Sequence, residues 1–194
     1  MSETALTKVI AIVVTHGPDD RLDRQLETLV SQVSTVWIVD NGSDEEAIER
    51  LRSHERALGA RLKLIFNEVN RGLAAAQNQG IAAALEDGAD WLLLLDQDSI
   101  PLRDMISQLL FAAETYDRPE KIGFLSPTHG DDSGGPGAPV YAHGHGVGIR
   151  RYWLSAGEVD DGLAFAMASG CLVRAERLRE VGDMAADFWI DYID

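Results

Sequence analysis

Short, continuous runs of apolar residues alternate with segments of helical periodicity along the first two thirds of the chain. The run from Val9 to Val14 is unbroken and rich in β-branched residues, as in a strand that is buried on both faces of a sheet. Further strand-like runs lie at residues 36–39, 62–66, 91–95 and 122–125. Helical patterns fill the intervals, at residues 22–33, 44–58, 73–85 and 102–116. This alternation predicts an α/β fold with a mostly parallel sheet and helices on both faces.

The pattern changes after Pro127. Residues 128–139 contain four glycines and two prolines, a composition that is typical of a loop. Two strand-like segments and a short helical one follow, at residues 141–152, 163–167 and 175–181. Because this second half is too short to bury a core of its own, we expect a single domain over residues 1–194. It would consist of a parallel half at 1–127 and a small antiparallel or mixed half at 128–194.

The charge balance and the cysteine count exclude several classes of protein. The 194 residues include 17 Lys and Arg against 32 Asp and Glu, for a formal net charge of −15. Nucleic-acid affinity comes largely from Lys and Arg on phosphates, so we expect no nucleic-acid partner. The single cysteine, Cys171, excludes an intrachain disulfide framework and a multi-cysteine zinc site. No run approaches the roughly 20 apolar residues of a membrane span. The run at residues 9–14 is too short for a secretory signal, and we expect a cytoplasmic protein.

Polar residues follow each strand-like run in the first half. They include Thr15, Asp40, Asn70, Arg71, Gly72 and Asp96. Because ligands of such sheets bind outside the carboxyl ends of the strands, we expect these side chains to surround a ligand site. The alternative is that Asp, Asn and Gly make turns here and cap the following helices, and we favour that interpretation for Ser43 and Asp44.

The segment Asp96-Gln97-Asp98 is the most informative of these, because it directly follows a buried strand. An Asp-x-Asp pair is common in sequences, and its place at a strand end is what points to function. Mg²⁺ or Mn²⁺ usually bridges one or two carboxylates and the oxygens of a substrate phosphate. The segment lacks the further ligands and the glycine of an EF-hand loop. We therefore expect a divalent metal, Mg²⁺ or Mn²⁺, with Asp98 and Asp96 as its ligands.

Several motifs in a fixed order give the chain a family resemblance. They are Val13-Val14-Thr15-His16, Val39-Asp40-Asn41-Gly42-Ser43, Asn70-Arg71-Gly72 with Asn78-Gln79-Gly80, and Asp96-Gln97-Asp98. Together they resemble the family 2 glycosyltransferases, which have the Rossmann-like GT-A fold and use nucleotide-sugar donors. The Asp-Gln-Asp form of the metal motif, with the segments at 168–173 and 187–194, resembles the rhamnosyltransferase branch. The resemblance covers nearly the whole chain.

The resemblance implies roles for the matching residues on the donor side. Thr15 and Asp40 would line the nucleoside pocket, and Asp40 would accept a hydrogen bond from the base. Asp96 would face the ribose or the metal ion, and Asp98 would bind the ion. The residues expected against the base and ribose are Asn70, Arg71 and Gly72. The donor that the branch implies is dTDP-L-rhamnose.

The resemblance places the acceptor side at the end of the chain. Asp194 matches the acid of the acceptor-side motif and is the expected general base, with Asp191 as second candidate. Phe188 and Trp189 precede them and are expected to contact the acceptor, a saccharide or lipid-linked saccharide. The family implies inversion at the anomeric carbon. Because its members usually continue beyond this motif, we expect an incomplete domain. Any peripheral membrane association of the full-length protein would come from the continuation.

Two other functions use similar residues. A sugar nucleotidyltransferase also combines a carboxylate pair with a nucleotide, but it normally needs a basic, glycine-rich loop where residues 15–20 are acidic. A non-catalytic nucleotide-sugar-binding homologue would keep the donor side and lack transfer. His143 and His145 point to one face if they lie on a strand, but no further ligand stands at a diagnostic spacing, and we expect loop histidines.

Overall fold

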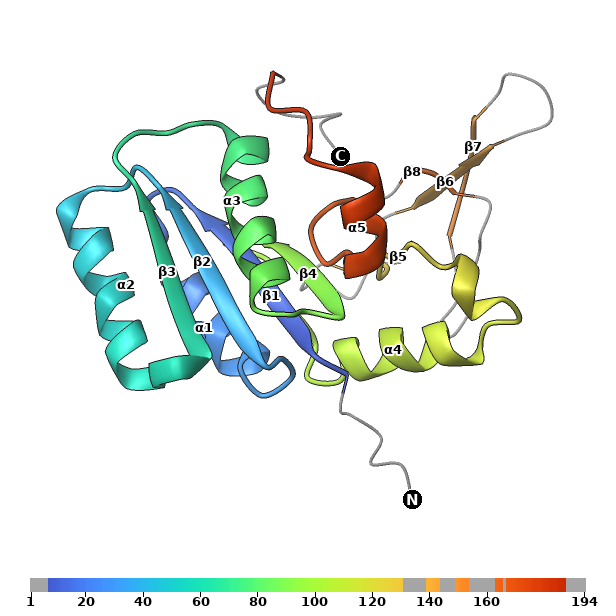
Figure 1. Cartoon of the computed structure of the whole chain (residues 1–194), viewed down its shortest axis with the longest axis horizontal. Coiled ribbons are helices and arrows are strands. Elements are labelled where there is room, and N and C mark those ends of the chain that lie inside the picture. The colour runs from blue at the N-terminus through green and yellow to red at the C-terminus, as the bar shows by residue number, and fades with distance from the viewer. Residues whose placement is uncertain (1–6, 131–138, 144–148, 154–162, 166, 188–194) are drawn as a thin grey trace.

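The computed structural model describes residues 7–130, 139–143, 149–153, 163–165 and 167–187. Its main sheet has six strands in the order β3-β2-β1-β4-β9-β5 (Figure 1). Four strands are parallel, namely β1 (Val9–Thr15), β2 (Thr35–Asn41), β3 (Leu62–Asn67) and β4 (Trp91–Asp96). The short strands β9 (Leu172–Arg174) and β5 (Phe124–Leu125) complete the sheet, and β9 is antiparallel to both of its neighbours. The predicted mostly parallel α/β sheet is confirmed.

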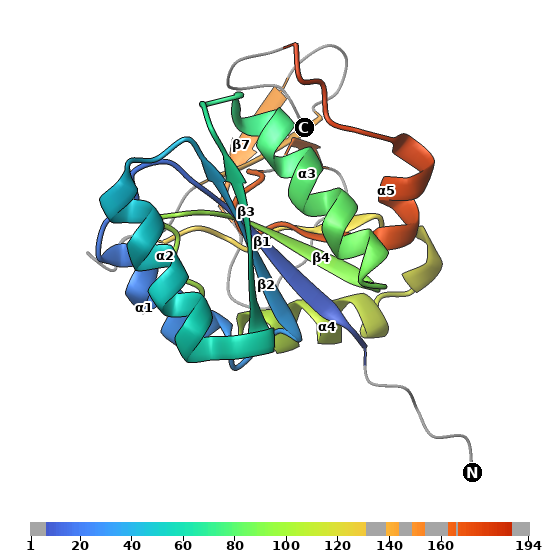
Figure 2. The same cartoon turned by 60° about the vertical axis from the view of Figure 1, so that its left-hand side comes forward.

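Helices cover both faces of this sheet (Figures 1 and 2). One face is covered by α1 (Arg21–Leu29), α2 (Glu45–Leu58) and α4 (Met105–Thr115). The other face is covered by α3 (Leu73–Glu86) and α5 (Ala175–Val181). Single 3₁₀ turns, η1 (Gly59–Arg61) and η2 (Pro119–Lys121), precede β3 and β5. None of the helices in the described ranges is long and apolar enough to span a membrane.

The unbroken apolar sequence of β1 follows from its central place. Val9, Ala11 and Val13 belong to the core under α1, α2 and α4, whereas Ile10 and Ile12 belong to the core under α3 and α5. All five side chains are at most 3% exposed. Since successive side chains of a strand point to opposite faces, a strand with helices on both sides must be apolar at every position.

Helix α3 lies close to the sheet because it carries a glycine at the contact. A Cβ atom on Gly80 would lie 2.5 Å from Cγ2 of Ile12 in β1, and 3.2 Å from Cγ2 of Val39 in β2. The first separation is too short for a real Cβ contact, and the second would require Val39 to shift slightly. The glycine of the motif Asn78-Gln79-Gly80 therefore sets the depth of α3, whose first turn borders the carboxyl edge of the sheet.

The second half differs in part from the prediction. Its three-stranded antiparallel sheet, in the order β7-β6-β8, contains β6 (Val140–His143), β7 (Ile149–Tyr152) and β8 (Leu163–Phe165). Figure 1 shows β6 and β7 projecting from the main body. Strand β9 is not predicted by the sequence pattern, and it separates β5 from the parallel strands. It is three residues long and continues directly into α5, so it has no periodicity that could reveal it. Helix α4 begins at Met105 rather than at 102, after a turn that follows Pro101.

Candidate functional site

The register of the parallel strands brings the predicted polar residues to one edge of the sheet. Thr15 at the end of β1 pairs with Asp40 of β2, and the residue before Thr15 pairs with Asp96 of β4. Asn41, the last residue of β2, pairs with Asn67 of β3. Four strands thus end at one level, as expected for residues that share a ligand site.

A pocket of about 240 Å³ opens at this edge. It is lined by Val14, Thr15, His16, Asn41, Asn70, Gly72, Leu73, Asp96 and Gln97. Four of the predicted nucleotide-binding residues are therefore brought together, namely Thr15, Asn70, Gly72 and Asp96. Three other predicted residues, Asp40, Arg71 and Asp98, are not part of this lining.

Asp40 is completely buried, as is the neighbouring Thr15. Its carboxylate accepts hydrogen bonds from the Thr15 hydroxyl (3.0 Å), from the Ser43 N–H (3.0 Å) and from the Ser43 hydroxyl. The Ser43 oxygen also accepts a hydrogen bond from the Gly17 N–H at 2.8 Å. Because a buried carboxylate must be hydrogen bonded, this network fixes the loops after β1 and β2 to each other. Asp44 caps α2 as expected, its side chain accepting from the N–H of Ala47.

A second network fixes the segment that leads into α3. The Asn41 amide group donates to Oδ1 of Asn70 (2.9 Å), and Oδ1 of Asn41 accepts from the Arg71 N–H (3.0 Å). The Gly72 N–H donates to the same Asn70 oxygen at 2.9 Å. Gly42 has a φ of +87°, and a Cβ there would lie 2.7 Å from the Asn70 backbone nitrogen. The glycine of the Asp40–Ser43 motif therefore allows the two loops to approach each other.

The turn after β4 is held from α1 by Gln25, which is completely buried. Its Nε2 donates to the backbone carbonyl of Asp96 at 2.7 Å and to that of Ser99 at 2.5 Å. Both ends of the Asp-Gln-Asp turn are thus fixed by one amide group. The other amide atom, Oε1, is buried and has no hydrogen-bond partner among the residues that the structure describes.

The same turn is held on its other side by Ser169, which precedes β9. The Ser169 hydroxyl accepts from the Asp96 N–H (3.0 Å) and donates to the Ser99 hydroxyl (2.8 Å). Between these points, Oε1 of Gln97 accepts from the His16 N–H at 2.8 Å. The turn that carries the two acids is therefore held by residues of the β1–α1 region and by Ser169, which are far from it in the sequence.

Asp98 is half exposed and contacts a cation from α1. Its Oδ2 lies 3.2 Å from Nη1 of Arg21. Asp19 holds the other side of that guanidinium, with Oδ2 2.8 Å from Nη2 and both oxygens within 3.1 Å of Nε. The hydrogen bonds from Arg21 lower the pKa of Asp19, and Asp19 raises the pKa of Arg21.

The donor atoms at this turn fit a divalent ion that arrives with a phosphate ligand. Within the described ranges, no three His, Cys, Asp or Glu side chains form a group that could hold a metal ion alone. A Mg²⁺ site completed by phosphate oxygens needs only one or two carboxylates. Asp96 and Asp98 would offer carboxylate oxygens, which are the ligand type that such an ion prefers, and Asp98 already contacts a positive group, Arg21.

The predicted acceptor-side residues lie outside the described residues. They are Phe188, Trp189, Asp191 and Asp194, and their roles stay predictions. His145 is outside as well, and His143 is an exposed residue at the end of β6.

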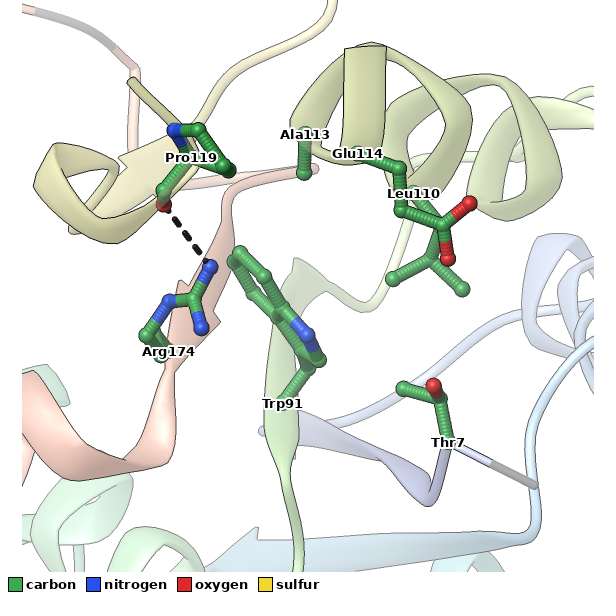
Figure 3. A pocket seen from close by; sticks show the side chains of 7 residues that line it. All are labelled: Thr7, Trp91, Leu110, Ala113, Glu114, Pro119 and Arg174. Atoms are coloured by element: carbon green, nitrogen blue, oxygen red, sulfur yellow. Dashed lines mark hydrogen bonds between the residues drawn. The ribbon is translucent and has the colours of Figure 1, made fainter. Parts of the chain in front are cut away.

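A separate pocket of about 210 Å³ lies at the opposite, amino end of β4 (Figure 3). Arg174 of β9 stacks on the Trp91 ring there, 4.6 Å from its centroid. Its Nη2 donates to the Pro119 carbonyl and its Nε to the Ile122 carbonyl, each at 3.1 Å. Arg174 therefore joins β9 to η2 and β5, and we interpret this pocket as part of a structural junction.

Comparison with known proteins identifies the family. The sequence profile of Glycosyl transferase family 2 matches residues 10–120, more than half of the chain. The chain belongs to glycosyl transferase family 2. The matched segment runs from β1 to η2 and includes every residue that lines the pocket at the carboxyl edge.

Two curated relatives extend the similarity beyond the family segment. The chain is 27% identical over 190 residues to the dTDP-rhamnosyl transferase RfbF of Shigella flexneri, covering 97% of this chain and 61% of RfbF. It is 30% identical over 189 residues to the galactofuranosyltransferase GlfT1 of Mycolicibacterium smegmatis, covering 90% of this chain and 58% of GlfT1. The chain thus spans only about three fifths of the length of these relatives.

Solved structures show the same fold. S. aureus TarS 1-349 superposes with a TM-score of 0.68 at 14% identity, covering 95% of this chain and 52% of TarS. GalNAc-T7, solved with UDP, GalNAc and Mn²⁺, also has a TM-score of 0.68, at 17% identity, covering 97% of this chain and 39% of GalNAc-T7. These likenesses support the GT-A fold that the family 2 resemblance implies.

The positioning residue Gln25 is absent from the predicted site, whereas Ser169 lies in the segment 168–173 that carries the rhamnosyltransferase resemblance. Gln25 carries a recognisable signal, because it is a polar residue on the apolar face that Leu22, Leu26 and Leu29 define in α1. The sequence signal of Ser169 is weaker. Its segment resembles the rhamnosyltransferase branch, but it lies far along the chain from the Asp-Gln-Asp segment.

Proposed function

We propose that this chain is part of an inverting, metal-dependent glycosyltransferase that acts in the cytoplasm. It would transfer L-rhamnose from dTDP-L-rhamnose to a hydroxyl of a polysaccharide or lipid-linked saccharide. The observation that carries the proposal is the pocket at the carboxyl ends of β1, β2 and β4, with Asp96 in its wall and Asp98 two residues further on. The similarity to a dTDP-rhamnosyl transferase supports the choice of donor.

We assign donor binding to residues 1–127 and the acceptor side to residues 128–194. Val14 and Leu73 offer apolar contact to a nucleoside, and Asp96 can accept a hydrogen bond from a ribose hydroxyl. Asp40 and Thr15 would support the pocket through their buried hydrogen bond.

The proposed chemistry uses groups on both sides of the donor sugar. A divalent ion held by Asp98 and Asp96 would act as a Lewis acid and offset the negative charge that develops on the departing diphosphate. Asp194, with Asp191 as second candidate, would accept the proton of the attacking hydroxyl as general base. One base on the face opposite the leaving group gives inversion at the anomeric carbon.

The experiment that tests donor binding follows thermal stability during titration with dTDP, UDP and GDP, with and without Mn²⁺. A ligand of the native state raises the unfolding temperature, so dTDP with Mn²⁺ should give the largest shift. Asp98→Ala should remove the dependence on Mn²⁺. If no nucleoside diphosphate stabilises the protein in the presence of metal, the proposal is wrong. A larger shift with UDP would instead favour a different donor.

A transfer assay separates the proposal from its alternatives. The full-length protein should release dTDP from dTDP-L-rhamnose in the presence of acceptor, and Asp194→Ala should retain dTDP binding and lose this release. A non-catalytic homologue would bind dTDP but would not release dTDP from dTDP-L-rhamnose. A sugar nucleotidyltransferase would form the nucleotide sugar from a sugar phosphate and a nucleoside triphosphate.

A further inference from the structure

The Asp98 carboxylate has a positively charged partner from a distant part of the chain. Arg21, the first residue of α1, places Nη1 3.2 Å from Oδ2 of Asp98, although the two residues are 77 positions apart. The remaining donors of the guanidinium face Asp19, with Nη2 2.8 Å and Nε 2.9 Å from its Oδ2. One side of Arg21 is therefore fixed locally, and the other side reaches the predicted metal ligand.

We propose that Arg21 pairs with Asp98 until the divalent ion binds, and then binds the diphosphate of the donor. This inference rests on the proposed function, because it takes Asp98 as a metal ligand. Nη1 of Arg21 occupies Oδ2 of Asp98, so an ion that binds this oxygen displaces the guanidinium. Asp19 keeps the displaced side chain at the site through its contacts with Nε and Nη2.

The released guanidinium is suited to a phosphate. Arginine offers several N–H donors in a planar fork that matches phosphate oxygens, and such charge-assisted hydrogen bonds are strong. A diphosphate bound to the same metal ion as Asp98 would lie beside the guanidinium of Arg21, which no longer pairs with Asp98. Metal and donor binding would therefore replace the Arg21–Asp98 ion pair by two contacts. Asp98 would contact the metal ion, and Arg21 would contact the diphosphate of the donor.

This arrangement predicts opposite effects on two ligands when the charge of Arg21 is removed. The ion pair opposes metal binding in the absence of nucleotide, and the same side chain supports nucleotide binding once the metal is present. A residue with only a structural role would weaken both. Arg24 provides a matched control, since it is exposed, lies in the same helix and carries the same charge.

The test measures Mn²⁺ binding without nucleotide by electron paramagnetic resonance, and dTDP binding at saturating Mn²⁺ by calorimetry. Arg21→Gln should bind Mn²⁺ about twofold to fivefold more tightly than the natural chain, as expected for loss of an exposed competing ion pair. It should bind dTDP about threefold to tenfold more weakly, through loss of a charged hydrogen bond that solvent partly screens. Arg24→Gln should change neither affinity by more than a small factor, and circular dichroism would confirm that each variant is folded.

Arg21→Lys provides a second variant that keeps the charge. It should leave Mn²⁺ affinity near that of the natural chain and recover part of the dTDP affinity. Unchanged Mn²⁺ affinity in Arg21→Gln, or a change of both affinities in the same direction, would overturn the inference while leaving the proposed function intact. Failure of the natural chain to bind dTDP with any metal would instead refute the proposed function.

Discussion

Replacing Gln25 with methionine tests whether one buried amide holds the turn that carries Asp96 and Asp98. Methionine has a similar length and no hydrogen-bond donor, so the change removes the bonds to the Asp96 and Ser99 carbonyls with little change in volume. The turn would remain bonded to Ser169 on its other side. We therefore expect a folded protein with a less rigid metal turn.

The expected magnitude follows from the hydrogen bonds of the Gln25 side chain. Two donated bonds contribute about 1 kcal/mol each to stability. Removing the amide also removes Oε1, which is buried and has no hydrogen-bond partner in the described part of the chain. The unfavourable desolvation of this oxygen is then no longer a cost to the folded state. That gain offsets part of the loss, at about 1 kcal/mol. The unfolding free energy should thus fall by about 1 kcal/mol.

The measurement is urea unfolding, combined with a Mn²⁺ titration of the folded protein. Gln108→Met, at an exposed position of α4, is the matched control and should leave both quantities unchanged. Gln25→Glu should be more damaging than Gln25→Met, because it places a carboxylate against two carbonyl oxygens. If Gln25→Met is as stable as the natural chain and binds Mn²⁺ equally well, the turn does not depend on Gln25.

Three further changes test the packing and the charges of the fold. Gly42→Ala should lower the unfolding free energy by about 2–4 kcal/mol, because a side chain at this positive φ also collides with the neighbouring loop; urea unfolding checks this. Gly80→Ala should cost about 1–3 kcal/mol in the same assay, since its methyl group would force α3 away from the sheet. Hydrogen bonds from Lys63 and Trp37 lower the pKa of Asp87 in the folded state. The ionised Asp87 therefore stabilises the fold at any pH above its unfolded pKa of about 3.9. This contribution is lost as the pH falls through the lower folded pKa. Asp87→Asn should therefore be less stable than the natural chain by about 0.5–1 kcal/mol at pH 7, and thermal unfolding should show the difference disappearing as the pH falls through the lowered folded pKa of Asp87.

The parallel half of the fold is predictable because its signals are local. The apolar run at Val9–Val14 and the similar runs in β2 and β4 need no knowledge of their neighbours to be recognised as buried strands. Strand β9 is different, because its three residues form a strand only by pairing with Trp91–Leu93 on one side and with β5 on the other. A short antiparallel insertion of this kind depends on contacts that no sequence period reports.

The candidate site also contains some residues whose position the local sequence predicts and others whose position it does not. The position of Asp96 follows from its place directly after a buried strand, and the structure puts it in the pocket wall. The contacts that support that residue are harder to predict, since Gln25 and Ser169 reach it from segments 71 and 73 residues away and no local pattern names the turn that they contact. Asp40 lies at a strand end as predicted, but its carboxylate is completely buried and accepts three hydrogen bonds, and its contact with the base stays a prediction.

The most direct test of the account locates the metal ion that accompanies the nucleotide. Mn²⁺ is paramagnetic and broadens the amide resonances of nearby residues, so a nuclear magnetic resonance titration of the isotope-labelled chain with Mn²⁺ and dTDP reports its position. The account predicts that the amides of His16, Gln97 and Ser99 broaden first, while those of Trp91 and Arg174 at the other end of β4 stay sharp. Broadening centred on Trp91 and Arg174, or no localised broadening at saturating dTDP, would contradict it.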